Sequence, residues 1–232
     1  MSAFLASVRC VEEAKIALDY ADIIDLKEPH NGALGALPLA VIEDIVRFVD
    51  GRKLVSATVG DLPMQQEVIV RATEATAATG VDVIKVGLFK FDAACIAALA
   101  PLTKRGIQLV AVLFVDISLH FESIPLLAKA GFYGVMLDTA YKQGGGLCDS
   151  VSLKQLEVFL TQAREHGLMA GLAGSLCVEN IEPLSALSPD YLGFRGALCE
   201  QNQRKNYLES SKLEQMQKLL QKYHTTVPLL TA

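Results

Sequence analysis

The sequence has no stretch of about 18 uncharged apolar residues, so it lacks the usual pattern of a membrane-spanning helix. The run IQLVAVLFV (residues 107–115) has the length of a β-strand and ends before Asp116. The first ten residues, MSAFLASVRC, lack the basic start and the long apolar core of a secretory signal. We therefore predict a cytoplasmic protein with no membrane partner.

Basic patches and metal-binding motifs are also missing. The net charge is -5, and no run of basic residues is interleaved with aromatic ones, which argues against a nucleic-acid partner. The five cysteines form no CxxC pair and the four histidines are dispersed. This pattern favours reduced cysteines packed in a core over a metal site or a cysteine nucleophile.

What is present is a regular alternation of short β-branched runs and longer amphipathic segments. The predicted strands are residues 3–7, 22–27, 53–59, 82–88, 108–115, 134–139, 168–174 and 191–196. The predicted helices are residues 10–20, 38–50, 64–79, 91–104, 122–131, 152–167, 177–187 and 209–223. No linker-like composition divides these eight units.

Eight strand–helix units in 232 residues predict a single domain, residues 1–232, with the (β/α)₈ TIM-barrel fold. An open dinucleotide-binding sheet is the alternative, but LASVRCVEEA after the first strand lacks the glycines of a GxGxxG turn. From about residue 201 we expect a polar, helical C-terminal tail. The apolar end of that tail, VPLLTA, would pack on the barrel or on a second subunit, so a homo-oligomer stays open.

Charged residues lie at the carboxyl ends of the predicted strands, where these barrels place their active sites. Lys27, Lys85 and Asp138 come from the second, fourth and sixth strands, so one barrel layer can hold all three. Asp25 points to the same face as Lys27 because strand side chains alternate. Two close ammonium groups lower each other's pKa, and a neutral amine is what a Schiff base requires. The alternative is a lysine where a strand emerges into solvent.

Small residues after the seventh and eighth strands predict a phosphate site. Gly174, Ser175, Gly196 and Ala197 could offer backbone N–H groups to an anion, and Arg195 lies at the end of the eighth strand. On the third strand, Thr58 and the following Asp61 could bind a polyol substrate or could instead cap the next helix.

Several segments resemble one enzyme family along nearly the whole chain, in the same order. These segments are IIDLKEPHNGALGA, VSATVGDLP, VIKVGL, MLDTAYK, LAGSL and GFRGALC. They are similar to the (5-formylfuran-3-yl)methyl phosphate synthases, also called 4-(hydroxymethyl)-2-furancarboxaldehyde-phosphate synthases, of methanofuran biosynthesis.

The resemblance implies a lysine-dependent lyase that joins two molecules of glyceraldehyde 3-phosphate into a phosphorylated furan aldehyde, losing phosphate and water. Lys27 matches the Schiff-base lysine and Lys85 the proton-transferring lysine, while Asp138 and Lys142 match further active-site positions. No metal or organic cofactor is implied. Lys142 could also be a solvated loop residue.

The chain departs from the family pattern in two places. The loop after DTAYK is rich in glycine (QGGGLCD), so a lid role for residues 142–149 stays open. Between Arg105 and Lys129 there is no lysine, and His120 is the one candidate replacement. Two other functions remain: a different class I aldolase acting on phosphorylated sugars, and a non-catalytic barrel that binds phosphosugars.

Overall fold

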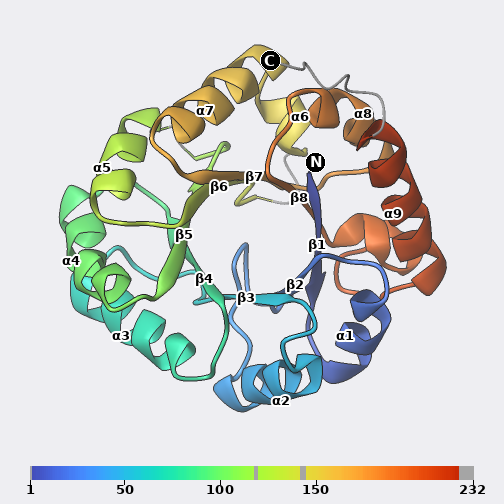
Figure 1. Ribbon diagram of the computed structural model, residues 1–232, viewed down its shortest axis with the longest axis horizontal. Helices are drawn as coiled ribbons and strands as arrows, with labels where there is room; N and C mark the ends of the chain where they lie inside the picture. The colour runs from blue at the N-terminus through green and yellow to red at the C-terminus, as the bar shows by residue number, and fades with distance from the viewer. Residues whose placement is uncertain (1, 118–119, 142–144, 225–232) are drawn as a thin grey trace.

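A computed structural model describes residues 2–117, 120–141 and 145–224. Eight parallel strands close into a ring in chain order, with β1 paired to both β2 and β8 (Figure 1). They are β1 (Ala3–Val8), β2 (Ile23–Leu26), β3 (Leu54–Thr58), β4 (Val83–Leu88), β5 (Gln108–Phe114), β6 (Gly134–Asp138), β7 (Met169–Leu172) and β8 (Tyr191–Phe194). The predicted barrel is confirmed, and strand ends move by one or two residues from the prediction.

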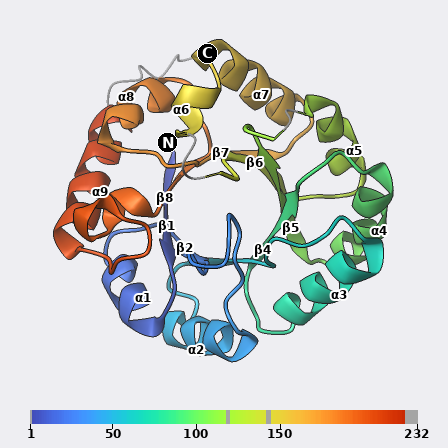
Figure 2. The ribbon, with the colours of Figure 1, turned by 180° about the vertical axis from the view of Figure 1, so that it is seen from behind.

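Helices surround the barrel and connect each strand to the next (Figures 1 and 2). They are α1 (Val11–Leu18), α2 (Leu39–Val49), α3 (Gln66–Ala77), α4 (Ala93–Lys104), α5 (Ile124–Lys129), α7 (Leu153–Glu165), α8 (Val178–Ala186) and α9 (Ser210–His224). Short helical turns that the sequence pattern did not predict are α6 (Leu147–Ser150), η1 (Phe121–Ser123), η2 (Gly196–Leu198) and η3 (Glu200–Asn202).

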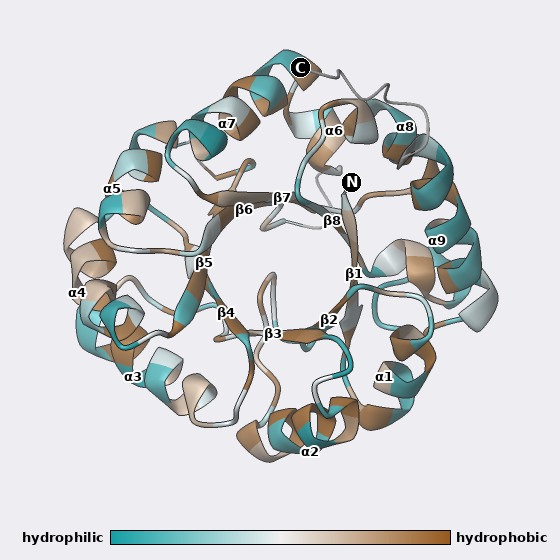
Figure 3. Ribbon diagram, in the orientation of Figure 1, coloured by the Kyte–Doolittle hydropathy of each residue, from teal (hydrophilic) through white to brown (hydrophobic). Residues whose placement is uncertain are grey.

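The apolar core is divided between two sides of the strands. On β5, Leu109, Ala111 and Leu113 belong to the large cluster under the helices, whereas the alternate residues Val110 and Val112 belong to a smaller cluster inside the barrel. Most helices carry their apolar residues on the face toward the strands and polar residues outside (Figure 3). This division leaves the inner side of the strands free to hold polar groups near the mouth.

The C-terminal segment completes the ring. Helix α9 packs against α8 and also contacts α1. Its own residues Leu213 and Met216 are buried. The Gln217 side-chain amide donates to the backbone carbonyl of Tyr20 at 2.8 Å, which ties this helix to the turn before β2. The residues of VPLLTA, 227–232, lie outside the described part of the chain.

The loop between β2 and α2 folds into the mouth of the barrel. Figures 1 and 2 show this blue loop reaching toward the barrel axis, and its Ala33 and Leu34 are buried in the interior cluster. The carboxylate of Asp61 accepts the backbone N–H groups of Ala33 and Leu34 at 2.8 and 2.7 Å. The Thr58 hydroxyl donates to the carbonyl of Gly35 at 3.0 Å. Two residues, Thr58 at the end of β3 and Asp61 shortly after it, therefore hold this loop through its backbone N–H and carbonyl groups.

Replacing Gly32 by alanine is expected to unfold this loop locally. Gly32 has φ +100°, and an added Cβ would lie 2.0 Å from Oδ2 of Asp61, so the carboxylate would have to release the loop. We expect a loss of roughly 1–3 kcal/mol of unfolding free energy, measured by urea denaturation. Gly106, whose φ is +88° and whose added Cβ would meet nothing within 4 Å, provides the control, since Gly106→Ala shares the backbone strain without the clash. An equal loss in both variants would contradict the role given to Asp61.

Candidate active site

Two ion pairs lie inside the barrel near its mouth. The Lys85 Nζ atom is 2.5 Å from Oδ1 of Asp25, and the Lys27 Nζ atom is 3.6 Å from Oδ2 of Asp138. All four residues are buried. They come from β2, β4 and β6, as the alternation of inward side chains requires. The three predicted strand-end charges and Asp25 therefore meet in one place.

Asp25 is the most enclosed member of this group. Its side chain accepts hydrogen bonds from the hydroxyls of Ser7 at 2.8 Å and Ser56 at 2.7 Å, residues that lie opposite it in the registers of β1 and β3. Burial opposes ionisation of this carboxyl, but the charges of Lys85 and Lys27 outweigh burial and hold its pKa below the ordinary range. Asp25 is therefore a buried carboxylate that fixes the position of the Lys85 amine.

For the Lys85 amine, in contrast, the effect of burial on the pKa outweighs that of its charged partner. Burial lowers its pKa below the ordinary value and the neighbouring Lys27 charge lowers it further, while the Asp25 carboxylate raises it. Folding thus disfavours the ammonium form. The unfolded chain binds more protons than the folded chain between the folded pKa and about 10.4, so this group makes stability rise with pH in that window.

Changing Asp25 to asparagine is expected to lower the pKa of Lys85 further, because the negative charge that favours its ammonium form is removed. The measurement is an NMR titration of the Nζ resonance of Lys85 in both proteins. Lys90, an exposed lysine on the loop after β4, serves as the internal reference. A midpoint that stays in place or rises in the variant would contradict the pairing of Lys85 with Asp25.

Asp138 and the segment after it are ordered by backbone contacts. The Thr139 N–H donates to Oδ1 of Asp138 at 2.7 Å, which leaves Oδ2 facing Lys27. Asp116, at the end of β5, accepts the N–H groups of Ala140 and Tyr141 at 2.7 and 2.6 Å. The next residue, Lys142, lies outside the described residues, so its place in the site stays a prediction.

A cavity of about 510 Å³ opens above the lysines at the carboxyl ends of the strands. Its walls include both ion pairs and every residue of the predicted phosphate cradle, namely Asp25, Lys27, Lys85, Asp138, Gly174, Ser175, Arg195, Gly196 and Ala197. Thr58 and Asp61 do not line it, and their described hydrogen bonds hold the β2–α2 loop. The predicted substrate contact of these two residues stays a prediction.

The turns after β7 and β8 have the form of an anion cradle. Gly174 and Ser175 adopt left-handed backbone conformations, with φ +113° and +51°, at the turn leading to α8. Gly196 and Ala197 open the helical turn η2. Within the described part of the chain, the backbone N–H groups of Ser175, Gly196 and Ala197 donate to no protein acceptor. These donors border the cavity, which suits a phosphate.

Arg195 supports this cradle from behind. Its guanidinium donates to both oxygens of Glu13, at 2.5 and 3.0 Å, and to the backbone carbonyls of Ser7, Arg204 and Asn206. These five bonds use all five of its N–H groups. Direct contact between Arg195 and a substrate stays a prediction, whereas its described bonds tie α1, β1 and the segment after β8 together.

Several residues at the site were not singled out from the sequence. Ser7 and Glu13 lie on β1 and α1 with no motif around them, and Arg204 follows β8 in a segment without a regular period. Alternation along β1 could have placed Ser7 on the inner face, beside the second strand. The position of Arg204 gave no such signal, because side-chain direction is not periodic in a loop.

Other features lie away from the two lysines. Nδ1 of His120 is 2.9 Å from the carboxylate of Glu122, and the His120 ring lies against Phe91, with ring centroids 5.9 Å apart. Among residues 2–117, 120–141 and 145–224, no three His, Cys, Asp or Glu side chains converge as metal ligands would. Over the same ranges, no helix has the length and apolar character needed to cross a membrane.

Residues 4–217 match the family model described as 4-HFC-P synthase. The chain belongs to the 4-HFC-P synthase family. The resemblance seen in the sequence is thereby confirmed, and the family match covers β2 to β8, β1 apart from Ala3, and the first half of α9.

Relatives of this family were found by sequence comparison. A putative (5-formylfuran-3-yl)methyl phosphate synthase of Methylorubrum extorquens is 42% identical over 212 residues, which cover 91% of this chain and 88% of the relative. The (5-formylfuran-3-yl)methyl phosphate synthase of Methanococcus aeolicus is 36% identical over 231 residues, covering 93% of this chain and 98% of the relative. Both relatives therefore match this family member over nearly their whole length.

Solved structures show the same fold at much lower sequence identity. The 3-hexulose-6-phosphate synthase of Salmonella typhimurium superposes with a TM-score of 0.70 at 16% identity, covering 96% of this chain and 100% of that chain. The phosphoribosyl anthranilate isomerase of Thermus thermophilus gives a TM-score of 0.67 at 16% identity, covering 96% and 99%. At this identity the likeness of this chain to these proteins concerns the barrel alone.

Proposed function

We propose that this family member condenses two molecules of glyceraldehyde 3-phosphate into 4-(hydroxymethyl)-2-furancarboxaldehyde phosphate, through a Schiff base on Lys27, in methanofuran biosynthesis. The atoms balance when one phosphate and two waters leave. The observation that carries the proposal is a pair of buried lysines in one cavity, each beside its own carboxylate. A purely structural barrel gains little from two such costly pairs in its mouth.

Lys27 suits the role of the nucleophile. Its amine lines the cavity and meets the Asp138 carboxylate only at 3.6 Å, a looser contact than the 2.5 Å pair below it. Attack of the neutral amine on the aldehyde forms a carbinolamine, and loss of water gives the iminium. Asp138 lies where it can accept and return a proton during these steps.

Lys85 suits proton transfer next to the iminium. Burial and the nearby Lys27 charge lower its pKa, which brings an amine closer to exchanging protons at neutral pH. Asp25 holds this amine in place and is itself held by Ser7 and Ser56. Removal of a proton from the carbon next to the iminium gives an enamine, and phosphate then leaves from C3 of the same triose. The carbon that lost phosphate joins C2 of the second triose, as the 4-substituted furan requires, and ring closure releases two waters in the overall balance.

The test is incubation of the purified protein with glyceraldehyde 3-phosphate alone. We expect a rising near-ultraviolet band from a conjugated furan aldehyde, together with release of one inorganic phosphate for each two trioses consumed. Mass spectrometry of the product distinguishes the furan from a plain aldol adduct. A phosphorylated aldol with no phosphate release would support the alternative of a different class I aldolase, and a flat trace from folded protein would overturn the proposal.

A further inference from the structure

Two phosphorylated substrates need two phosphate positions, and the cradle after β7 and β8 supplies one. Given the proposed function, on which this inference rests, a cationic side chain in the cavity could hold the second phosphate. The cationic residues that line the cavity in the described part of the chain are Lys27, Lys85, Arg195, Arg204 and Lys212. Most of them are already engaged by other parts of the protein.

Three of these residues are held by other protein groups. Lys85 is paired with Asp25, and Arg195 uses all five of its N–H groups on protein acceptors. The Lys212 amine contacts the carbonyl of Cys199 at 2.6 Å, Oδ1 of Asn202 at 3.0 Å and the carboxylate of Glu209 at 3.3 Å. Lys27 faces Asp138 and is reserved for the Schiff base in the proposed reaction.

Arg204 differs from all of these. Its Nη2 atom donates to the carbonyl of Gly32 at 2.9 Å, and its other four N–H groups donate to no acceptor among the described residues. Burial lowers the pKa of this guanidinium, and the carboxylates of Asp138 and Asp61 act against that effect. Its charge is therefore felt by the same Asp138 that faces Lys27.

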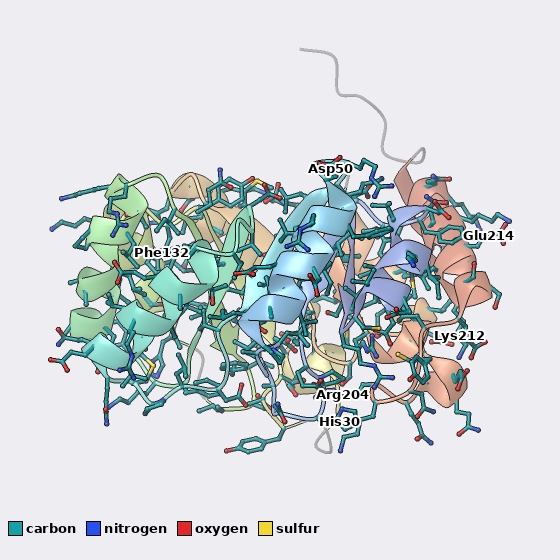
Figure 4. The ribbon with its side chains drawn as sticks, turned by 90° about the horizontal axis from the view of Figure 1, so that it is seen from below. His30, Asp50, Phe132, Arg204, Lys212 and Glu214 are labelled. Carbon is teal, nitrogen blue, oxygen red and sulfur yellow. The ribbon has the colours of Figure 1, made fainter. Side chains whose placement is uncertain are left out.

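The position of Arg204 fits a substrate contact at the mouth. Its bond to Gly32 joins the segment after β8 to the β2–α2 loop in the mouth. Figure 4 places Arg204 at the same end of the barrel as His30 and at the opposite end from Asp50, which follows α2. A guanidinium with free, parallel N–H groups binds phosphate oxygens in a bidentate manner.

We propose that Arg204 binds the phosphate of the second triose phosphate, the one that enters after the first has formed its iminium on Lys27. The first phosphate occupies the Ser175–Gly196 cradle, and the second lies nearer the solvent, between Arg204 and the β2–α2 loop. Arg204 thereby selects a phosphorylated triose as the second reactant and excludes uncharged ones.

Binding of glycerol 3-phosphate tests this assignment without relying on the reaction, because this compound has no carbonyl and cannot form an imine. By calorimetry we expect two molecules bound per wild-type chain and one per chain in Arg204→Gln. Arg105→Gln is the matched control, since Arg105 is an exposed arginine paired with Glu74 on the outer helices, and it should keep two. Two molecules bound in Arg204→Gln would overturn the proposal, as would a single one in the wild type.

A trapping experiment assigns the two phosphates. With borohydride and glyceraldehyde 3-phosphate, Arg204→Gln should form the Lys27 adduct at the wild-type concentration dependence, while turnover needs roughly 10- to 100-fold more substrate. Arg204→Lys should recover part of that loss, and its melting temperature checks the fold. Weaker trapping in Arg204→Gln would place Arg204 in the first phosphate site and overturn the assignment. Absence of any wild-type adduct would instead refute the proposed Schiff base, with the calorimetric result still deciding the role of Arg204.

Discussion

Lys27→Arg is expected to lower turnover of glyceraldehyde 3-phosphate by roughly 10³-fold or more, with no borohydride adduct formed. Arginine keeps the positive charge that faces Asp138, so the ion pair inside the barrel survives. Its guanidinium, however, is protonated at every accessible pH and cannot attack an aldehyde. The substitution therefore separates the charge of Lys27 from its nucleophilicity.

Intact-protein mass spectrometry after borohydride reduction gives the first measurement, and the rate of furan formation gives the second. Lys90→Arg is the matched control, because Lys90 is an exposed lysine that follows β4 and faces Asp92 at 3.9 Å. That variant should trap and turn over as the wild type does. An adduct of unchanged yield in Lys27→Arg would move the Schiff base to another lysine, with Lys85 and Lys142 the next to be replaced.

Lys85→Met is expected to cost about 3–5 kcal/mol of unfolding free energy, because it leaves the fully buried Asp25 carboxylate without its cation. The methionine fills most of the volume of the lysine stem, so the loss is electrostatic rather than a cavity effect. Activity should fall as well, since the proposed proton-transferring amine is absent. Urea denaturation at neutral pH measures the first effect and the furan assay the second.

A double-mutant cycle distinguishes the lost pair from a general disturbance of the barrel. Asp25→Asn combined with Lys85→Met removes both charges and should regain part of the stability lost in Lys85→Met, while activity stays low. Stability losses that simply add would show that the two side chains are not coupled, against the 2.5 Å contact between them.

Much of the site follows from strand periodicity. The ends of the even-numbered strands predict one layer that holds Lys27, Lys85 and Asp138, and the structure brings these residues to one cavity. Side chains of a strand alternate strictly, so a correct strand boundary also fixes which residues face inward. The same reasoning placed Asp25 on the inner face, although its partner Lys85 could not be inferred from spacing along the chain.

The contacts of Thr58, Asp61 and Arg195 are harder to predict from the sequence. The polyol contact predicted for Asp61 and Thr58 stays a prediction, and the structure shows both residues holding the β2–α2 loop in the mouth. The substrate contact predicted for Arg195 stays a prediction, and the structure shows its guanidinium bound to Glu13 and three backbone carbonyls. Each of these side chains binds groups in a loop or on another element, and such contacts leave no periodic pattern in the sequence.

The sequence by itself determined the eight-unit barrel and the family, because periodicity and the segments around Lys27, Lys85 and Asp138 are local properties of the chain. Only the tertiary structure decided which charges pair. Asp25 with Lys85 and Arg195 with Glu13 are contacts between residues far apart in sequence, made as the ring closes. Ring closure also brings Arg204, after β8, to the carbonyl of Gly32 in the loop after β2, while its other N–H groups meet no acceptor among the described residues.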